Sequence, residues 1–273
     1  MTTIGEVGQR TRFDVREFAR TARGNHRDEL QLSEFASAPL SPESVRMVRY
    51  MGRLESATME HLRNLLVTAT HKDARVTAFL VTWAFEKFWI ADALDAVLEA
   101  NGAERFQDAP EGKVQKRRTE SADRRGPISR AVSAIRLGVP IIAVHTTTGL
   151  IDEWITRAAY VRLAAQGKSA ALASTISMIL DVKKRHQEFF DDESRRRLGD
   201  DPRAVKLTRK TLLTASWPIG AVDRAADDRS FFEDYVFGGE AGVASATEIE
   251  TRVASLPGLD DRIGEAVARK LLP

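Results

Sequence analysis

Four segments of similar length carry the periodicity of an amphipathic helix, with apolar residues at alternating steps of three and four. They cover residues 42–70, 73–100, 140–166 and 168–198. At 1.5 Å per residue, each would be about 40 Å long. The first segment adjoins the second and the third adjoins the fourth, so each pair is predicted to form an antiparallel hairpin. The sequence therefore predicts an all-α protein with a four-helix bundle at its centre.

The ends of these segments carry the usual start and stop signals of helices. Ser41 can cap the first helix, and Pro42 suits the first helical position. Asn101 and Gly102 follow the second segment, where such residues commonly end a helix. Gly199 follows the fourth segment in the same way. These signals predict the helix boundaries independently of the apolar pattern.

The rest of the chain divides around the bundle. Residues 41–199 form the predicted bundle, and a long crossover at 101–139 connects its two hairpins. Two hairpins with one long crossover are the connectivity of ferritin-like bundles. Residues 1–40 are interpreted as a polar N-terminal arm, and residues 200–273 as a C-terminal extension of shorter helices. We expect the arm and residues 105–127 to be the least packed parts, because they lack an apolar stripe.

Composition narrows the chemistry that the chain can perform. There is no cysteine, which excludes disulfides, thiolate metal sites and cysteine nucleophiles. The net charge of +2 gives no strong field toward nucleic acids, so we expect no specific nucleic-acid binding. No apolar run reaches the ~20 residues of a membrane-spanning helix, and residues 1–24 do not resemble a secretory leader, so we expect a cytoplasmic protein. No phosphate-binding, dinucleotide-binding or hydrolase motif occurs.

A charged residue interrupts the apolar stripe of each predicted bundle helix near its middle. The four residues are Glu55, Lys87, Glu153 and Lys183, and His186 follows about one turn after the last of them. A single charge on a stripe often lies at its edge and reaches water. Four charges at one level favour pairing inside the bundle instead, because a buried charge without a partner costs several kcal/mol. Each lysine is therefore predicted to point inward and to lie within ~4 Å of a carboxylate.

Several of these segments resemble helices of acyl-carrier-protein desaturases and other di-iron ferritin-like oxidoreductases. Residues 171–190, ALASTISMILDVKKRHQEFF, resemble the fourth bundle helix of that family, with its D-E-x-R-H run followed by aromatic residues. Residues 83–94, WAFEKFWIADAL, resemble the family's second helix, with its W-x-x-E-E-x-x-H pattern. Residues 151–153 resemble the glutamate region of its third helix, and Glu55 falls where its first helix supplies a carboxylate. The resemblance covers residues 41–198.

The resemblance implies a di-metal site at the level of the four charges. In the family, one glutamate from each of two helices joins an E-x-x-H pair from each of the other two. Carboxylates and imidazoles three residues apart share one helix face, so the six ligands converge. Glu55, Glu153 and His186 match three of these ligands.

The other three positions of the implied site hold residues that cannot bind a metal ion. Lys87 and Lys183 stand where the family has bridging glutamates, and Ile90 stands where it has a histidine. An ammonium group has no lone pair and repels a cation. We therefore expect no metal cofactor, with the two lysines supplying the positive charge of the lost metal ions. The alternative is one weak iron or manganese site made by Glu55, Glu86, Glu153 and His186.

Three functions remain open on this basis. The first is a degenerate ferritin-like protein that has lost its di-metal centre and acts as a non-catalytic binding or regulatory scaffold. The second is a metal-dependent ferritin-like oxidoreductase with a reduced site. The third is a structural or assembly protein whose bundle merely buries ion pairs. Metal analysis separates the second from the others, and a pocket lined by residues such as Trp83, Ile90 and Met59 would favour ligand binding over the third.

The remaining features suggest partners rather than chemistry. An apolar small molecule is the candidate ligand of the bundle, and a homodimer is the candidate assembly. The basic run at 113–125 would suit an acidic protein partner, although such a run is most often a solvated loop. The other histidines, among them His61 and His145, belong to no recognisable triad or ligand set.

Overall fold

The computed structural model describes residues 12–106, 138–221 and 224–273. These residues form helices and connecting turns with no strand among them, which confirms the all-α class predicted from the sequence. No helix in this described part of the chain is both long enough and apolar enough to cross a membrane. The predicted crossover at 101–139 lies largely outside the described residues, and the basic run at 113–125 lies wholly outside them.

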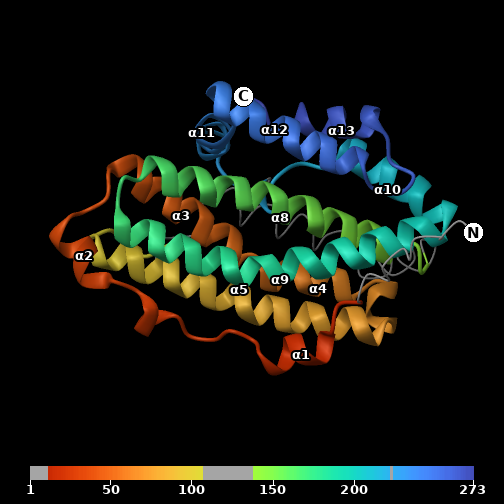
Figure 1. Ribbon diagram of the computed structural model, residues 1–273, viewed down its shortest axis with the longest axis horizontal. Coiled ribbons are helices and arrows are strands. Elements are labelled where there is room, and N and C mark those ends of the chain that lie inside the picture. Colours follow the sequence, from red (N-terminus) through yellow and green to blue (C-terminus); the bar gives the residue numbers. More distant parts are fainter. Residues whose placement is uncertain (1–11, 107–137, 222–223) are drawn as a thin grey trace, which may run out of the picture.

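Long helices that lie side by side form the body of the molecule (Figure 1). They are α3 Pro42–Ser56, α4 Thr58–Leu66, α5 Ala74–Ala100, α8 Ile141–Gln166 and α9 Ala170–Asp200. α3 and α4 pack along α5, and α8 packs along α9, as the two predicted hairpins require. α3 also contacts α8, and α5 contacts α9, so the two hairpins share one core.

The second, third and fourth predicted helices agree with α5, α8 and α9 to within a few residues. Asp73 accepts the Val76 backbone N–H at 3.0 Å and begins α5. The fourth helix continues through Gly199 to Asp200, slightly beyond its predicted end. Pro202 is the actual stop, because the residue before a proline is held out of the helical region, and Asp201 is extended.

The first predicted helix, 42–70, is interrupted at Ala57, where α3 ends and α4 begins. A 3₁₀ turn at Ala69–Lys72 then leads into α5. The interruption lies where the loop after α10 (Pro202–Thr214) approaches the bundle, since a Cβ atom added to Gly220 would lie 3.8 Å from the Ala57 Cβ. The apolar pattern continues across Ala57 and therefore predicts a single helix.

The described part of the N-terminal arm is held against the bundle by a few buried side chains, while most of its residues are exposed. Residues 1–11 of the arm, and residues 107–127 of the segment that we also expect to be poorly packed, lie outside the described residues. The described part of the arm contains α1 Val15–Arg20, a 3₁₀ turn at Arg27–Glu29 and α2 Leu32–Ser37. α1 and α2 both lie against α5. Phe18 and Phe35 are buried, with 2% and 0% of their surfaces exposed. Two well-separated aromatic side chains are enough to anchor the arm, although they are too far apart to form an apolar stripe.

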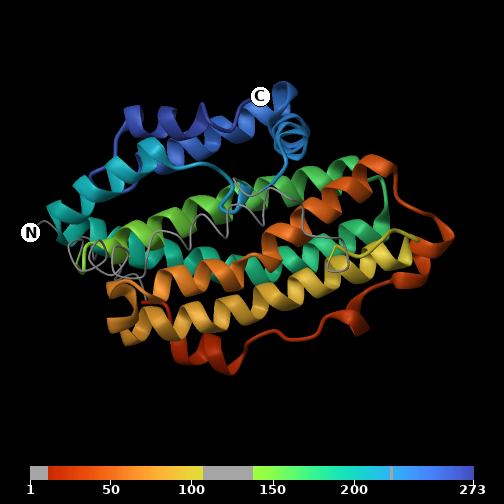
Figure 2. The same ribbon diagram turned by 180° about the vertical axis from the view of Figure 1, so that it is seen from behind.

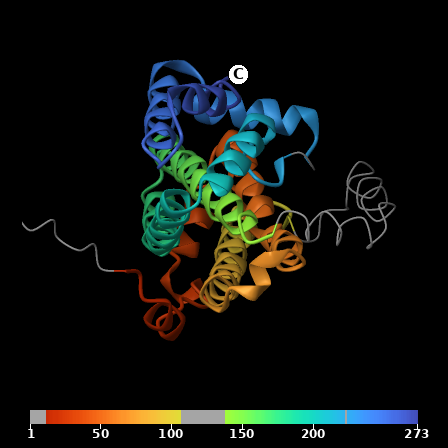
Figure 3. The same cartoon turned by 90° about the vertical axis from the view of Figure 1, so that its right-hand side faces the viewer.

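The C-terminal helices cover the side of the bundle that lies opposite the N-terminal arm (Figures 2 and 3). They are α10, α11 Ala226–Phe237, α12 Gly239–Ala254 and α13 Asp261–Ala268. α10, α11 and α12 all contact α8. With neighbours on several sides, α8 is buried around much of its circumference, which determines the surroundings of its acidic residues.

Candidate functional site

Four charged side chains, one each from α3, α5, α8 and α9, meet in the centre of the bundle. Glu55 lies on α3, Lys87 on α5, Glu153 on α8 and Lys183 on α9, and we call them the central tetrad. Their exposed fractions are 1%, 4%, 0% and 0% respectively. Lys87, Glu153 and Lys183 lie near the middle of their helices, and Glu55 lies at the end of α3, beside the interruption at Ala57.

The tetrad alternates in sign, so that each lysine contacts both glutamates. The Lys87 Nζ atom lies 3.0 Å from Glu55 Oε2 and 3.9 Å from Glu153 Oε1. The Lys183 Nζ atom lies 3.2 Å from Glu55 Oε1 and 2.7 Å from Glu153 Oε2. Both lysines therefore point inward and lie within 4 Å of a carboxylate, as their positions in the apolar stripes predict.

Two aromatic side chains donate hydrogen bonds to the tetrad glutamates. The Trp83 indole N–H donates to Glu153 at 3.1 Å, and the Tyr160 hydroxyl donates to Glu55 at 2.9 Å. Trp83 also lies one turn before Lys87, whose Nζ atom is 5.0 Å from the centre of the indole ring. Such support is needed because a buried charge is tolerated only when its partners and its hydrogen bonds are both in place.

The interactions within the tetrad hold Glu55, Glu153 and Lys87 in their charged forms. Burial acts to raise the pKa of Glu55 and of Glu153, but the charges of Lys183 and Lys87 outweigh it and lower both pKa values. Burial acts to lower the pKa of Lys87, but the two glutamates outweigh it and raise that pKa. Burial and the neighbouring Glu55 carboxylate raise the pKa of Tyr160, so its hydroxyl stays protonated and keeps donating.

Glu86 and His186 form a second buried group beside the tetrad. The His186 Nε2 atom lies 2.7 Å from Glu86 Oε2, and its Nδ1 atom lies 3.7 Å from Glu153 Oε1. Glu86 also accepts the backbone N–H of Arg23 at 2.7 Å and pairs with the Arg185 guanidinium. The structure therefore brings all six predicted residues together, with His186 as the link between the tetrad and a glutamate that faces the N-terminal arm.

This arrangement does not fit the ligand set of a di-metal centre. Both oxygens of Glu55 and both oxygens of Glu153 lie within 3.9 Å of a lysine nitrogen, where metal ions would have to lie. Ile90, at the implied histidine position, is fully buried and offers only carbon. Within the described ranges, no three histidine, aspartate or glutamate side chains gather in a way that could hold a metal ion.

Comparisons of the chain with models of protein families, with curated proteins and with solved structures found no match. The interpretation of the site therefore rests on the geometry of its side chains. That geometry has two parts, the closed central tetrad and a pocket that adjoins it.

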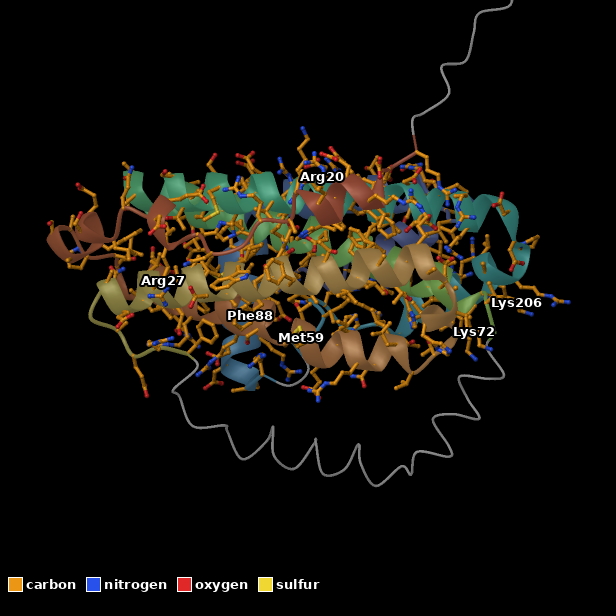
Figure 4. The ribbon with its side chains drawn as sticks, turned by 90° about the horizontal axis from the view of Figure 1, so that it is seen from below. Arg20, Arg27, Met59, Lys72, Phe88 and Lys206 are labelled. Carbon is orange, nitrogen blue, oxygen red and sulfur yellow. The ribbon has the colours of Figure 1, made fainter. Side chains whose placement is uncertain are left out.

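The pocket has a volume of about 130 Å³ and lies between the α3–α4 interruption, α5 and α8. Trp83 and Lys87 contribute to its wall, so it reaches the tetrad. Of the three residues named above for a pocket that would favour ligand binding, Trp83 lines this pocket, whereas Ile90 and Met59 do not. Ile90 is wholly buried elsewhere in the core, and Met59 is 49% exposed on the outer face that also carries Phe88 (Figure 4).

Four titratable side chains in the pocket were not predicted as site residues, and one of them is the exposed Glu60 of α4. His61 comes from α4, and His145 and Asp152 come from α8. Burial lowers the pKa of His61 to about 4, helped by the Lys87 charge, and lowers that of His145 to about 4, helped by His61, so both imidazoles are neutral at pH 7. Burial raises the pKa of Asp152 to about 6.

One sequence signal could have identified Asp152. It neighbours Glu153 on a predicted helix with apolar residues on nearly all sides, so a second acidic residue there is also expected to be buried. His61 and His145 carry no comparable signal, because they belong to different hairpins and meet only through the packing of α4 against the start of α8.

Proposed function

We propose that this protein is a non-catalytic ligand-binding bundle of ferritin-like connectivity, in which the central tetrad stands in place of a di-metal centre. Two hairpins with a long crossover between them support that connectivity. The observation that carries the proposal is the closed tetrad, in which lysine nitrogens contact every carboxylate oxygen of Glu55 and Glu153.

Charge balance explains why such a core is stable without metal. In a di-metal centre of the implied kind, two dications compensate four carboxylates. Here Lys87 and Lys183 compensate Glu55 and Glu153, and the buried tetrad is neutral. A cation entering this group would meet two ammonium charges before it could reach a free carboxylate oxygen.

The pocket favours a binding role over a purely structural one. A bundle that only buried ion pairs would have no need for a cavity at the tetrad, because packing around the charges would stabilise it further. Instead, the pocket gives a small molecule access to Lys87, Asp152 and two neutral imidazoles. This combination of apolar walls with a few converging polar groups is typical of small-molecule sites.

Metal content tests the proposal directly. Purified protein would be incubated with Fe(II) or Mn(II), desalted and analysed for metal per chain by mass spectrometry. We expect much less than one equivalent, because lysine repulsion and missing carboxylates act in the same direction. Two bound equivalents would overturn the proposal and favour the oxidoreductase, and one equivalent held by His186 with Glu55 or Glu153 would favour the reduced metal site.

A rebuilt ligand set provides the reciprocal experiment. The triple change Lys87→Glu, Ile90→His and Lys183→Glu restores the six ligands of the implied site, and this variant should gain metal. Lys184→Glu is the matched control, because Lys184 is the exposed neighbour of Lys183 and its replacement adds charge without adding a ligand. A triple variant that folds but binds no more metal than the control would contradict the assignment of these positions.

A further inference from the structure

The size of the pocket limits its ligand to a single ring. Its volume is about 130 Å³. A protein cavity of about 150 Å³ accommodates benzene, whereas sites for drug-sized ligands measure about 300–1,000 Å³. A molecule of roughly six to eight non-hydrogen atoms therefore fits this pocket.

Lys87 supplies a hydrogen-bond donor at one end of the pocket. An ammonium group carries three N–H donors. Among the described carboxylates, only that of Glu55 lies within hydrogen-bond distance of the Lys87 nitrogen, at 3.0 Å, since Glu153 Oε1 is 3.9 Å away. Lys87 also forms part of the pocket wall, so it can donate to a ligand carbonyl without leaving the tetrad.

Asp152 supplies a matching acceptor. Its Oδ1 atom accepts the Ile219 backbone N–H at 2.7 Å, which holds the carboxylate in place. Its Oδ2 atom makes no hydrogen bond to any residue that the structure describes, although the side chain is only 6% exposed. A carboxylate oxygen in the wall of a pocket can accept a hydrogen bond from a donor on a ligand.

The charges around the pocket favour an uncharged ligand. Lys87 is already compensated within the tetrad, and the two imidazoles are neutral at pH 7. The carboxylates of Asp152 and of the exposed Glu60 both line the pocket and disfavour an anion, and a cation bound against Lys87 would meet its ammonium charge. Trp83 and Phe190 line the pocket with their rings at 86° to one another, and provide apolar surface for a planar molecule.

We propose that the pocket binds an uncharged single-ring molecule with a carbonyl and an N–H group side by side on one edge, as in a lactam. The carbonyl accepts from Lys87, and the N–H donates to Asp152 Oδ2. This inference rests on the proposed binding function, since it specifies the ligand class of the same site.

The test uses 2-pyridone as the probe, with binding measured by ligand-observed NMR and calorimetry on the full chain. N-methyl-2-pyridone lacks the N–H, benzoate is an anion and benzylamine is a cation. We expect 2-pyridone to bind most tightly, and N-methyl-2-pyridone roughly tenfold or more weakly, because it leaves the Asp152 oxygen without a donor. Tighter binding of benzoate or benzylamine, or no binding of 2-pyridone up to about 10 mM, would overturn the proposed ligand class.

Asp152→Asn tests the acceptor. The amide oxygen can keep the Ile219 hydrogen bond while its NH₂ replaces the Oδ2 acceptor with a donor. We expect affinity for 2-pyridone to fall roughly tenfold or more, with affinity for N-methyl-2-pyridone retained. Asp181→Asn, at an exposed aspartate of α9, is the control and should change neither. Unchanged binding of 2-pyridone by folded Asp152→Asn would refute the role of Asp152.

The two proposals fail in different ways. If Asp152→Asn does not fold, the comparison of 2-pyridone with N-methyl-2-pyridone on the unmodified protein still decides the ligand class. Metal content is measured on the same samples. If the protein contains little metal and does not bind 2-pyridone, only the proposed ligand class is overturned. If it contains two metal equivalents per chain, the proposed binding function itself is overturned.

Discussion

Two networks of paired charges in this molecule differ in how they meet water. The central tetrad is enclosed at mid-bundle, with no member more than 4% exposed. The second, which we call the end network, joins the start of α5 to the end of α9 around a buried Glu193. Its members are Asp73, Arg75, Asp192, Glu193, Arg196 and Arg197.

The end network is built from arginines that keep part of their hydration. Arg75, Arg196 and Arg197 approach Glu193 within 2.8, 2.6 and 2.9 Å, and their side chains are 22%, 40% and 10% exposed. A lost partner there can be replaced partly by water. In the tetrad, Glu55, Glu153 and Lys183 are no more than 1% exposed, so little water can replace a lost partner and each charge is necessary for the others. Replacing one charge of the end network should therefore cost less free energy of unfolding than replacing one charge of the tetrad.

The largest effect is expected for Lys183→Met. It removes a fully buried ammonium and leaves Glu55 and Glu153 with one lysine between them. We expect a loss of about 3–5 kcal/mol in the free energy of unfolding, measured by urea denaturation. Adding Glu153→Gln should recover part of that loss, because it removes the stranded charge. A cost under about 0.5 kcal/mol would mean that Lys183 reaches water and that the two networks do not differ as described.

A smaller, pH-dependent effect is expected for Glu193→Gln. Burial acts to raise the Glu193 pKa, but Arg75, Arg196 and Arg197 outweigh it and lower that pKa to about 2. An unfolded glutamate has a pKa of about 4.3, so this stabilisation is complete above that pH and is lost as pH falls toward 2. With allowance for the hydrated arginines, the variant should lose about 1–2 kcal/mol at pH 7 and progressively less in acid. If the loss in the free energy of unfolding caused by Glu193→Gln increased as the pH fell from 5 to 3, the proposed role of the Glu193 carboxylate would be contradicted.

Added salt should reduce the stability loss in the end network more than the stability loss in the tetrad. The Debye length falls from about 10 Å at 0.1 M salt to about 3 Å at 1 M, and screening acts on charges that contact solvent. The cost of Glu193→Gln should therefore fall by roughly half in 1 M NaCl, while that of Lys183→Met stays nearly constant. Paired denaturation curves of both variants at the two salt concentrations measure this. Equal salt dependence would remove the proposed distinction.

The smallest effect is expected at the surface. Glu248 and Arg252 form an exposed pair one turn apart on α12, with side chains 63% and 43% exposed. Glu248→Gln removes the pair and leaves the Arg252 side chain in place. The expected change is below about 0.5 kcal/mol, which sets the baseline against which both networks are judged by thermal or urea denaturation.

Local sequence patterns determined the long helices and the level of the tetrad. The steps of three and four predict α5, α8 and α9 to within a few residues, because burying an apolar stripe and capping its ends are local properties. The same stripes contain Glu55, Lys87, Glu153 and Lys183 near the middle of each predicted helix. Since a buried charge requires a partner, their pairing could also be predicted without knowing the fold in detail.

Only the tertiary structure decided what surrounds the tetrad. Ala57, where α3 and α4 meet, lies beside Gly220, and Glu86 accepts the backbone N–H of Arg23 in the arm. The pocket brings His61 and Asp152 together from different hairpins. These contacts join residues that are far apart in the chain, so the helical periodicity of the sequence does not predict them. A period specifies which face of a helix is buried, whereas the identity of the neighbour that buries it follows from how all the helices and loops pack together.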